Sequence, residues 1–172
     1  MSSKDNNLSK GAEEELASVE EYSFAVVVAD WNSDITYKLK DGCIDTLKKY
    51  GAKTENIHVA HVPGAYELPM GARLMMGKEK IHAAICIGCV IKGETKHDEY
   101  INSAVATGIM NLSLASTKPV IFGLLTPNSH EQAVDRAGGA YGNKGVEAAV
   151  TAIKMVHLAK GADGGKKSIG FS

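Results

Sequence analysis

Short hydrophobic segments recur along the chain and alternate with longer amphipathic ones. Three of them are continuous apolar runs, Phe24–Ala29, Ala83–Ile91 and Val120–Leu125, and the fourth, Ile57–Val62, contains two histidines. Continuous apolar runs of this length are typical of strands that are buried on both faces of a parallel sheet. The pattern therefore predicts four strands over these ranges.

The longer segments predict helices. Between Ile35 and Tyr50, apolar residues recur at helical spacing while lysines occupy other positions, and Gly51 follows as a C-cap. The other expected helices are Tyr66–Met76, Asp98–Leu114, Ser129–Ala137 and Gly145–Lys160. Strands that alternate with helices indicate an α/β fold, in which one parallel four-stranded sheet lies between two layers of helices.

The 172 residues are expected to form a single domain over residues 23–160. Residues 1–22 are polar and acidic, which favours a flexible arm outside the core, and the Gly- and Lys-rich residues 161–172 favour a flexible tail. No apolar run approaches the roughly 20 residues of a membrane span, and the first residues lack the apolar segment of a secretory signal. Three cysteines suit a reducing compartment, so we expect a cytoplasmic protein. A net charge of -1 gives no electrostatic reason to bind nucleic acid.

Four polar turns follow the four predicted strands. They are Trp31–Asn32, Val62–Glu67, Gly93–His97 and Thr126–Ser129. Ligands of parallel α/β sheets bind beyond the carboxyl ends of the strands, so these turns should line one edge. The turn that ends at His97 opens a helix, and its N–H groups and dipole suit a phosphate or carboxylate. His97 beside that anion site is a candidate general base.

Several other residues have two readings from the sequence alone. Trp31 and Tyr66 could stack on a planar ligand or plug the end of the core. Arg136 and Lys144 could face solvent or bind a phosphate, Arg136 with a forked pair of hydrogen bonds. His58 and His61 lie on opposite faces of a strand and form no metal pair.

Cys86-Ile87-Gly88-Cys89 has the C-x-x-C spacing of zinc and redox motifs. Within a strand, however, residues three apart point to opposite faces and lie about 10 Å apart. A disulfide requires Cα atoms within about 7 Å. We therefore expect Cys86 and Cys89 to be buried structural residues, and no metal site.

Six motifs in order along the chain resemble those of the lumazine synthase family. The resemblance covers Phe24 to Leu158 and rests on residues 31–36 (Trp-Asn-Ser-Asp-Ile-Thr), 62–69 (Val-Pro-Gly-Ala-Tyr-Glu-Leu-Pro), 88–97 (Gly-Cys-Val-Ile-Lys-Gly-Glu-Thr-Lys-His), 119–126 (Pro-Val-Ile-Phe-Gly-Leu-Leu-Thr), 131–138 and 143–149. It implies a flavodoxin-like fold and the penultimate reaction of riboflavin biosynthesis. In that reaction a ribitylamino-aminopyrimidinedione condenses with dihydroxybutanone phosphate to give dimethyl-ribityl-lumazine, phosphate and water. The family uses no metal or organic cofactor.

The resemblance also implies roles for individual residues. Those on the pyrimidine substrate would be Trp31, Asn32, Ala65, Tyr66, Glu67, Cys89, Val90, Ile91, Phe122 and Lys144. Trp31 would stack on the ring, residues 65–67 would contact the ribityl chain, and residues 89–91 would line the ring edge through their backbone. Trp31 and Tyr66 stand where the family often has phenylalanine.

The phosphate substrate would be held by Glu94, Thr95 and Arg136, while His97 would move protons. Glu147 would support either His97 or Arg136. Phe122, Arg136 and Lys144 would come from a neighbouring subunit, because the family's sites lie between subunits of a pentamer. In this family a short turn between the last two helices accompanies shells of twelve pentamers, so the resemblance and the short turn over residues 137–143 imply a 60-subunit shell, which could enclose riboflavin synthase.

Three other functions fit the same residues. A non-catalytic flavin or phosphate binder would not need His97 together with Arg136 and Lys144. A shell protein that only encloses a partner would need a cargo-binding motif, and none is recognisable. A riboflavin synthase of the same fold would act on two lumazine molecules, and its reaction has no use for phosphate-binding residues.

Overall fold

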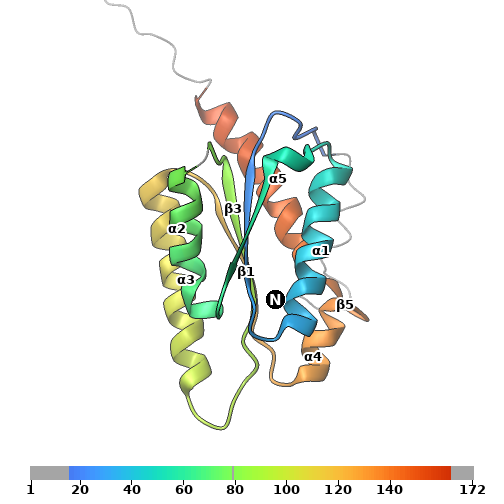
Figure 1. Cartoon of the computed structure of the whole chain (residues 1–172), viewed down its shortest axis with the longest axis vertical. Helices are drawn as coiled ribbons and strands as arrows, with labels where there is room; N and C mark the ends of the chain where they lie inside the picture. Colours follow the sequence, from blue (N-terminus) through green and yellow to red (C-terminus); the bar gives the residue numbers. More distant parts are fainter. Residues whose placement is uncertain (1–15, 79, 164–172) are drawn as a thin grey trace, which may run out of the picture.

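The computed structural model describes residues 16–78 and 80–163. Its long strands form one parallel sheet in the order β2-β1-β3-β4, with helices on both faces (Figure 1). The strands are β1 (Phe24–Ala29), β2 (Ile57–Val62), β3 (Ala83–Cys89) and β4 (Val120–Leu125). The helices are α1 (Ser33–Lys49), α2 (Leu68–Lys78), α3 (His97–Ser116), α4 (His130–Asp135) and α5 (Lys144–Asp163), with 3-10 turns η2 (Thr54–Asn56) and η3 (Ala65–Glu67). The expected three-layer α/β fold is confirmed.

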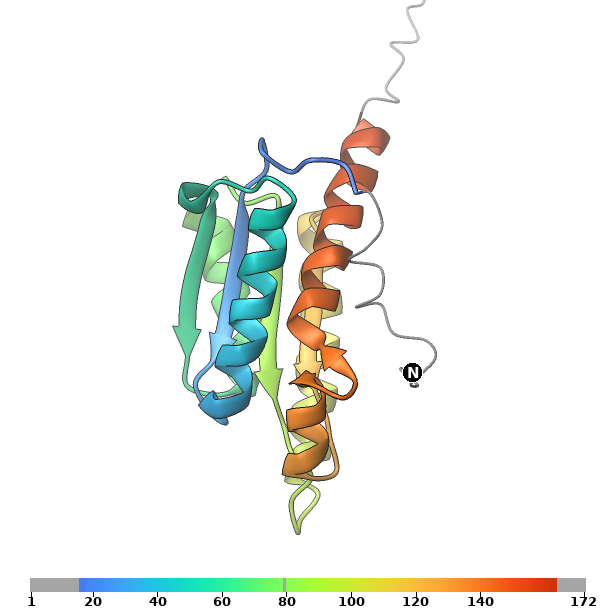
Figure 2. The ribbon, with the colours of Figure 1, turned by 90° about the vertical axis from the view of Figure 1, so that its right-hand side faces the viewer.

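Two apolar cores lie on the two faces of the sheet. Side chains of β1 alternate between them: Phe24, Val26 and Val28 pack with α1 and α5, whereas Ala25 and Val27 pack with α2 and α3. Figure 2 shows α1 and α5 side by side over one face. Every residue of β1 and β3 is buried, which explains their continuous apolar runs. The edge strand β2 is partly exposed, which explains how it accommodates two histidines.

Several element boundaries differ from the expected ones, and two of them lie beside the turns after the strands. β3 ends at Cys89 instead of Ile91, where the Cys89 carbonyl accepts a hydrogen bond from the Asn32 side chain. The helix expected from Tyr66 is a 3-10 turn followed by α2, which begins at Leu68. Pro69 lies in the first turn of α2, where a missing N–H costs nothing.

The glycine-rich segment after α4 forms a small hairpin that the sequence did not predict. Its strands are β5 (Ala137–Gly139) and β6 (Gly142–Asn143), which pair antiparallel. Gly138 and Gly142 have φ values of 112° and 77°, a region that favours glycine. α4 is consequently shorter than expected and ends at Asp135, because the chain turns into the hairpin.

The expectation that residues 1–22 lie outside the core is wrong for part of that range. Val19 and Tyr22 are buried against the core. The Val19 N–H donates to the Tyr50 carbonyl, and the Tyr22 ring meets the rings of His82 and His157 edge-on. Val19 and Tyr22, with Leu16 packed beside them, thus place this segment against the core under α1 and α5. Residues 1–15, and most of the expected tail at 164–172, lie outside the described residues.

The longest helices are α3 and α5. Across residues 16–78 and 80–163, neither these nor any other helix combines the length and hydrophobicity that a bilayer crossing requires.

Candidate functional site

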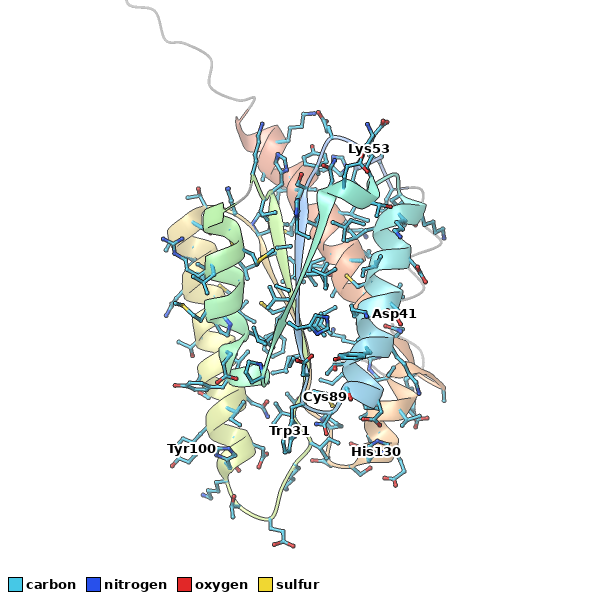
Figure 3. All side chains as sticks on the ribbon, viewed as in Figure 1. Trp31, Asp41, Lys53, Cys89, Tyr100 and His130 are labelled. Carbon is cyan, nitrogen blue, oxygen red and sulfur yellow. The ribbon has the colours of Figure 1, made fainter. Side chains whose placement is uncertain are left out.

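The four turns predicted to meet do follow the carboxyl ends of four parallel strands, and they gather at one end of the sheet (Figure 1). Figure 3 places Trp31 and Cys89 near each other at this end, with Tyr100 of α3 on one side and His130 of α4 on the other. This end of the molecule is therefore where a ligand could contact several segments at once.

Asn32 shapes the turn after β1. It has φ 59° and ψ 48°, the left-handed conformation that asparagine tolerates better than most residues, and its carbonyl accepts the Ile35 N–H that opens α1. Its side-chain Nδ2 donates to the Cys89 carbonyl across 2.9 Å. Asn32 thus ties the ends of β1 and β3 together. Its second Nδ2 hydrogen and its Oδ1 are not used in this contact, so Asn32 stays a predicted substrate-binding residue.

The two aromatic residues of the site face solvent. Trp31 is 71% exposed and Tyr66 is 62% exposed, so the alternative that they plug the end of the core is wrong. Beside Tyr66, Ala65 is buried, and Glu67 Oε2 accepts the Gly64 N–H at 3.1 Å to cap η3. The exposed rings are available to a planar ligand.

The segment after β3 forms the predicted strand–turn–helix arrangement. Cys89 is buried. The side chains of Val90 and Ile91 pack against opposite cores, and the backbone of these two residues directly follows the end of β3. Glu94, Thr95 and His97 are exposed. His97 is the first residue of α3, and its N–H donates to Thr95 Oγ1 at 3.4 Å. The exposed beginning of a long helix beside a histidine has the features predicted for an anion site next to a base.

Arg136 and Lys144 come together on one buried carboxylate. Arg136 Nη2 donates to Glu147 Oε1 at 2.8 Å, and Lys144 Nζ donates to Glu147 Oε2 at 3.0 Å. Arg136 Nη1 also donates to the Tyr141 carbonyl at 3.0 Å. The Glu147 side chain is only 3% exposed. Of the two roles considered for Glu147, its position supports Arg136.

The two cations and the turn at His97 belong to opposite helical layers of one chain. Arg136 follows α4 and Lys144 opens α5, on the face of the sheet that α1 covers, whereas α3 lies on the other face (Figure 1). Phe122 lies apart from both, in an apolar groove between α3 and the edge strand β4. The chain thus gathers the residues predicted for substrate binding into three separate groups.

The cysteines are structural, as expected. Cys86 packs in the core under α2 and α3 and Cys89 in the core under α1 and α5, and both are free. Burial raises the pKa of each thiol to about 12, with a smaller contribution from Asp34 at Cys89. Within the described part of the chain, no three His, Cys, Asp or Glu side chains gather as a metal site could require.

The comparison with protein families decides the identity. The family model for 6,7-dimethyl-8-ribityllumazine synthase matches residues 21–160. The chain belongs to the lumazine synthase family. A 6,7-dimethyl-8-ribityllumazine synthase from Cytophaga hutchinsonii is 48% identical over 156 residues, which cover 91% of this chain and 98% of the relative. One from Bacteroides fragilis is 54% identical over 133 residues, or 77% of this chain and 93% of the relative.

Membership of the lumazine synthase family confirms the resemblance drawn from the motifs and the enzyme class that it implied, in riboflavin biosynthesis. The roles of individual residues and the assembly of subunits stay predictions.

Two histidine–aspartate pairs at this end of the sheet were missed by the sequence analysis. His61 Nδ1 lies 2.7 Å from Asp30 Oδ1, and His130 Nε2 lies 2.6 Å from Asp34 Oδ2. His61 was considered only as a possible metal ligand, and no motif singled out His130. Asp30 and Asp34 flank Trp31-Asn32-Ser33 and could have been noticed in the sequence. Their histidine partners lie far away along the chain, so the pairing could not be recognised from the sequence.

Proposed function

We propose that this chain condenses 5-amino-6-(D-ribitylamino)uracil with 3,4-dihydroxy-2-butanone 4-phosphate to give 6,7-dimethyl-8-ribityllumazine, phosphate and water. The observation that carries the proposal is the exposed Trp31 indole at the same sheet edge as the opening of α3 at His97. The Trp31 indole suits the planar ring of the pyrimidine substrate. The start of α3 suits the phosphate group of the other substrate, with His97 beside it as a base.

On the pyrimidine side, Trp31 stacks on the ring with Asn32 beside it, and Ala65, Tyr66 and Glu67 contact the ribityl chain. The backbone of residues 89–91 lines the ring edge. The exposure of both aromatic rings and the buried positions of Ala65 and Cys89 support these roles.

On the phosphate side, the N–H groups at Glu94 and Thr95 bind the phosphate, and Arg136 forms charge-assisted bonds with it. His97 moves protons between the reacting groups. The substrates supply both the amine and the carbonyl, so the reaction requires no nucleophile from the enzyme. Proximity accounts for several kcal/mol of the barrier, on the order of 7 or more in well-oriented systems, and His97 adds about 100- to 10,000-fold.

The complete site requires a second subunit. Arg136 and Lys144 lie on the face of the sheet opposite to α3, away from the turn at His97 in the same chain. This separation supports a site in which Phe122, Arg136 and Lys144 come from a neighbouring chain. We propose a homopentamer in the cytoplasm, with twelve pentamers in a 60-subunit shell that can enclose riboflavin synthase. The short connection through the β5–β6 hairpin supports the shell. Sedimentation tests it, since a particle of pentamer mass would contradict the shell.

The decisive assay mixes the two substrates with the purified chain and follows lumazine absorbance and phosphate release together. Equal amounts of lumazine and phosphate are expected. Binding without either product would favour a non-catalytic binder. In a separate reaction supplied with lumazine alone, formation of riboflavin would favour a riboflavin synthase of this fold.

A further inference from the structure

The turn that presents Trp31 is hydrogen-bonded to the ends of both neighbouring strands, to β2 through its backbone and to β3 through the Asn32 side chain. The Asp30 N–H donates to the Val62 carbonyl at 2.9 Å, and the Trp31 N–H donates to the Pro63 carbonyl at 3.2 Å. Asn32 is tied to the end of β3, as described above. Only the indole projects freely, so its direction depends on how rigidly these neighbours are held.

A cluster of three side chains, Asp30, Tyr37 and His61, adds a further restraint. Asp30 Oδ1 accepts hydrogen bonds from His61 Nδ1 at 2.7 Å and from the Tyr37 hydroxyl at 2.9 Å. The rings of Tyr37 and His61 meet edge-on, with centroids 5.4 Å apart. A carboxylate only accepts, so Nδ1 of His61 carries the proton. This Asp30 cluster joins α1 to β2 across the base of the Trp31 turn.

Stability does not explain the Asp30 cluster, because polar pairs this exposed contribute little to the free energy of unfolding, even when both partners are charged. The hydrogen bond from His61, and then that from Tyr37, lowers the pKa of the Asp30 carboxyl. The same contact raises the pKa of the Tyr37 hydroxyl. Both shifts keep the acceptor ionised and the donor protonated, so the geometry persists near neutral pH.

We propose that Asp30 is a positioning residue for Trp31: through His61 and Tyr37 it holds the turn so that the indole faces a planar heteroaromatic ring. The inference rests on the proposed stacking role of Trp31. Asp30, Tyr37 and His61 do not touch the ring in this arrangement. They set the angle and mobility of the one side chain that does.

The test combines steady-state kinetics with time-resolved fluorescence anisotropy of the assembled full chain. Trp31 is the only tryptophan, so its fluorescence reports this turn alone. Asp30→Ala and the double variant His61→Leu/Tyr37→Phe should raise KM for the ribitylamino-pyrimidine about 10-fold, as a misplaced binding group does. KM for the phosphate substrate should stay within about 2-fold of the wild-type value, and the indole should become more mobile.

Two single variants provide the controls. His61→Asn keeps a side-chain N–H near the position of Nδ1, so the KM for the ribitylamino-pyrimidine and the indole anisotropy should stay near their wild-type values. His58→Leu changes a histidine of the same strand outside the cluster and should alter neither. Unchanged anisotropy in Asp30→Ala would overturn the inference, as would an equal effect of His58→Leu. If the wild-type chain forms no lumazine, the proposed function fails, while anisotropy still decides whether Asp30 holds Trp31.

Discussion

Arg136 and Glu147 form an ion pair of 2.8 Å in which the Glu147 side chain is almost completely buried and the Arg136 side chain is 15% exposed. Glu147 also accepts from Lys144, so one buried anion orients both cations that we assign to the neighbouring subunit's site. Arg136 keeps some of its five N–H groups for a ligand, since those used here are on Nη1 and Nη2. Glu147 therefore orients Arg136 and leaves some of its N–H groups for a ligand.

Replacing Glu147 by alanine should lower the free energy of unfolding by about 1–3 kcal/mol, because two partly buried cations lose their partner. The KM for the phosphate substrate should rise as Arg136 loses its orientation. Urea denaturation and steady-state kinetics measure the two effects. Glu55→Gln, at an exposed carboxylate in η2, should change neither. Wild-type stability in Glu147→Ala would contradict the structural role of the ion pair.

Arg136→Ala should act on substrate binding more than on folding. Loss of a charge-assisted hydrogen bond of about 1.5–3 kcal/mol corresponds to about a 10- to 100-fold increase in the KM of the phosphate substrate. The KM of the pyrimidine should change little. Arg73→Ala, at an exposed arginine of α2, is the matched control. An unchanged affinity for the phosphate substrate would exclude Arg136 from its site.

His97→Ala should slow turnover by about 100- to 10,000-fold without abolishing it, since the reacting groups belong to the substrates. Both KM values should remain near those of the wild type. Single-turnover kinetics with both substrates measures the chemical step, and His58→Ala serves as the control histidine. Complete loss of turnover with intact binding would show a larger role for His97 than proton transfer, and an unchanged rate would show none.

The fold was predictable from the sequence because its signals are local. Apolar runs fixed the positions of β1, β2 and β4 to the residue, and the turns after them predicted the edge where Trp31 and His97 lie. The β5–β6 hairpin was missed, since glycine-rich segments carry no hydrophobic period. The burial of Tyr22 was missed because acidic neighbours outweighed two apolar residues in the composition.

The partners of site residues were less predictable than their positions. The hydrogen-bonded pairs His61–Asp30 and His130–Asp34 join segments far apart in the chain, and only the register of β1 with β2 and the packing of α4 near α1 bring them together. The contact of Glu147 with Lys144 could be suspected because the two residues are three positions apart. Its contact with Arg136 depends on the β5–β6 hairpin, which brings Arg136 back to α5. Pairings of this kind follow from tertiary structure and have no sequence period.

The Asp34–His130 pair should make stability depend on pH in the acid range. The hydrogen bond from the His130 side chain lowers the pKa of the Asp34 carboxyl below its ordinary value of 3.8. A lowered pKa in the folded state adds stability above the unfolded value, and this is lost as the pH falls through the folded one. Denaturation of wild type and Asp34→Asn from pH 2.5 to 6 should show a small difference above about pH 4 that disappears in stronger acid.

The pair itself, and not Asp34 alone, should produce that dependence. In a His130→Ala background, Asp34→Asn should change the pH dependence of stability much less, because the main cause of the lowered Asp34 pKa is absent. A difference between wild type and Asp34→Asn that stays constant across this range would contradict the assignment.

Gly145 should tolerate no side chain, although it lies in a helix. A Cβ atom there would lie 1.8 Å from the Leu39 carbonyl oxygen, a backbone atom of α1 that cannot turn away. Gly145→Ala should therefore force α1 and α5 apart and lower the free energy of unfolding by about 1–3 kcal/mol or more. Gly161, on the same helix with open space around it, is the matched control: Gly161→Ala should be neutral or gain up to about 1 kcal/mol in helix propensity.

Gly145→Ala should also affect substrate binding. Asn143 Oδ1 accepts the Gly145 N–H at 2.8 Å, so the displacement should reach Lys144 and raise the KM for the pyrimidine substrate. Equal stability of the two variants would show that α1 and α5 separate more easily than their contact indicates.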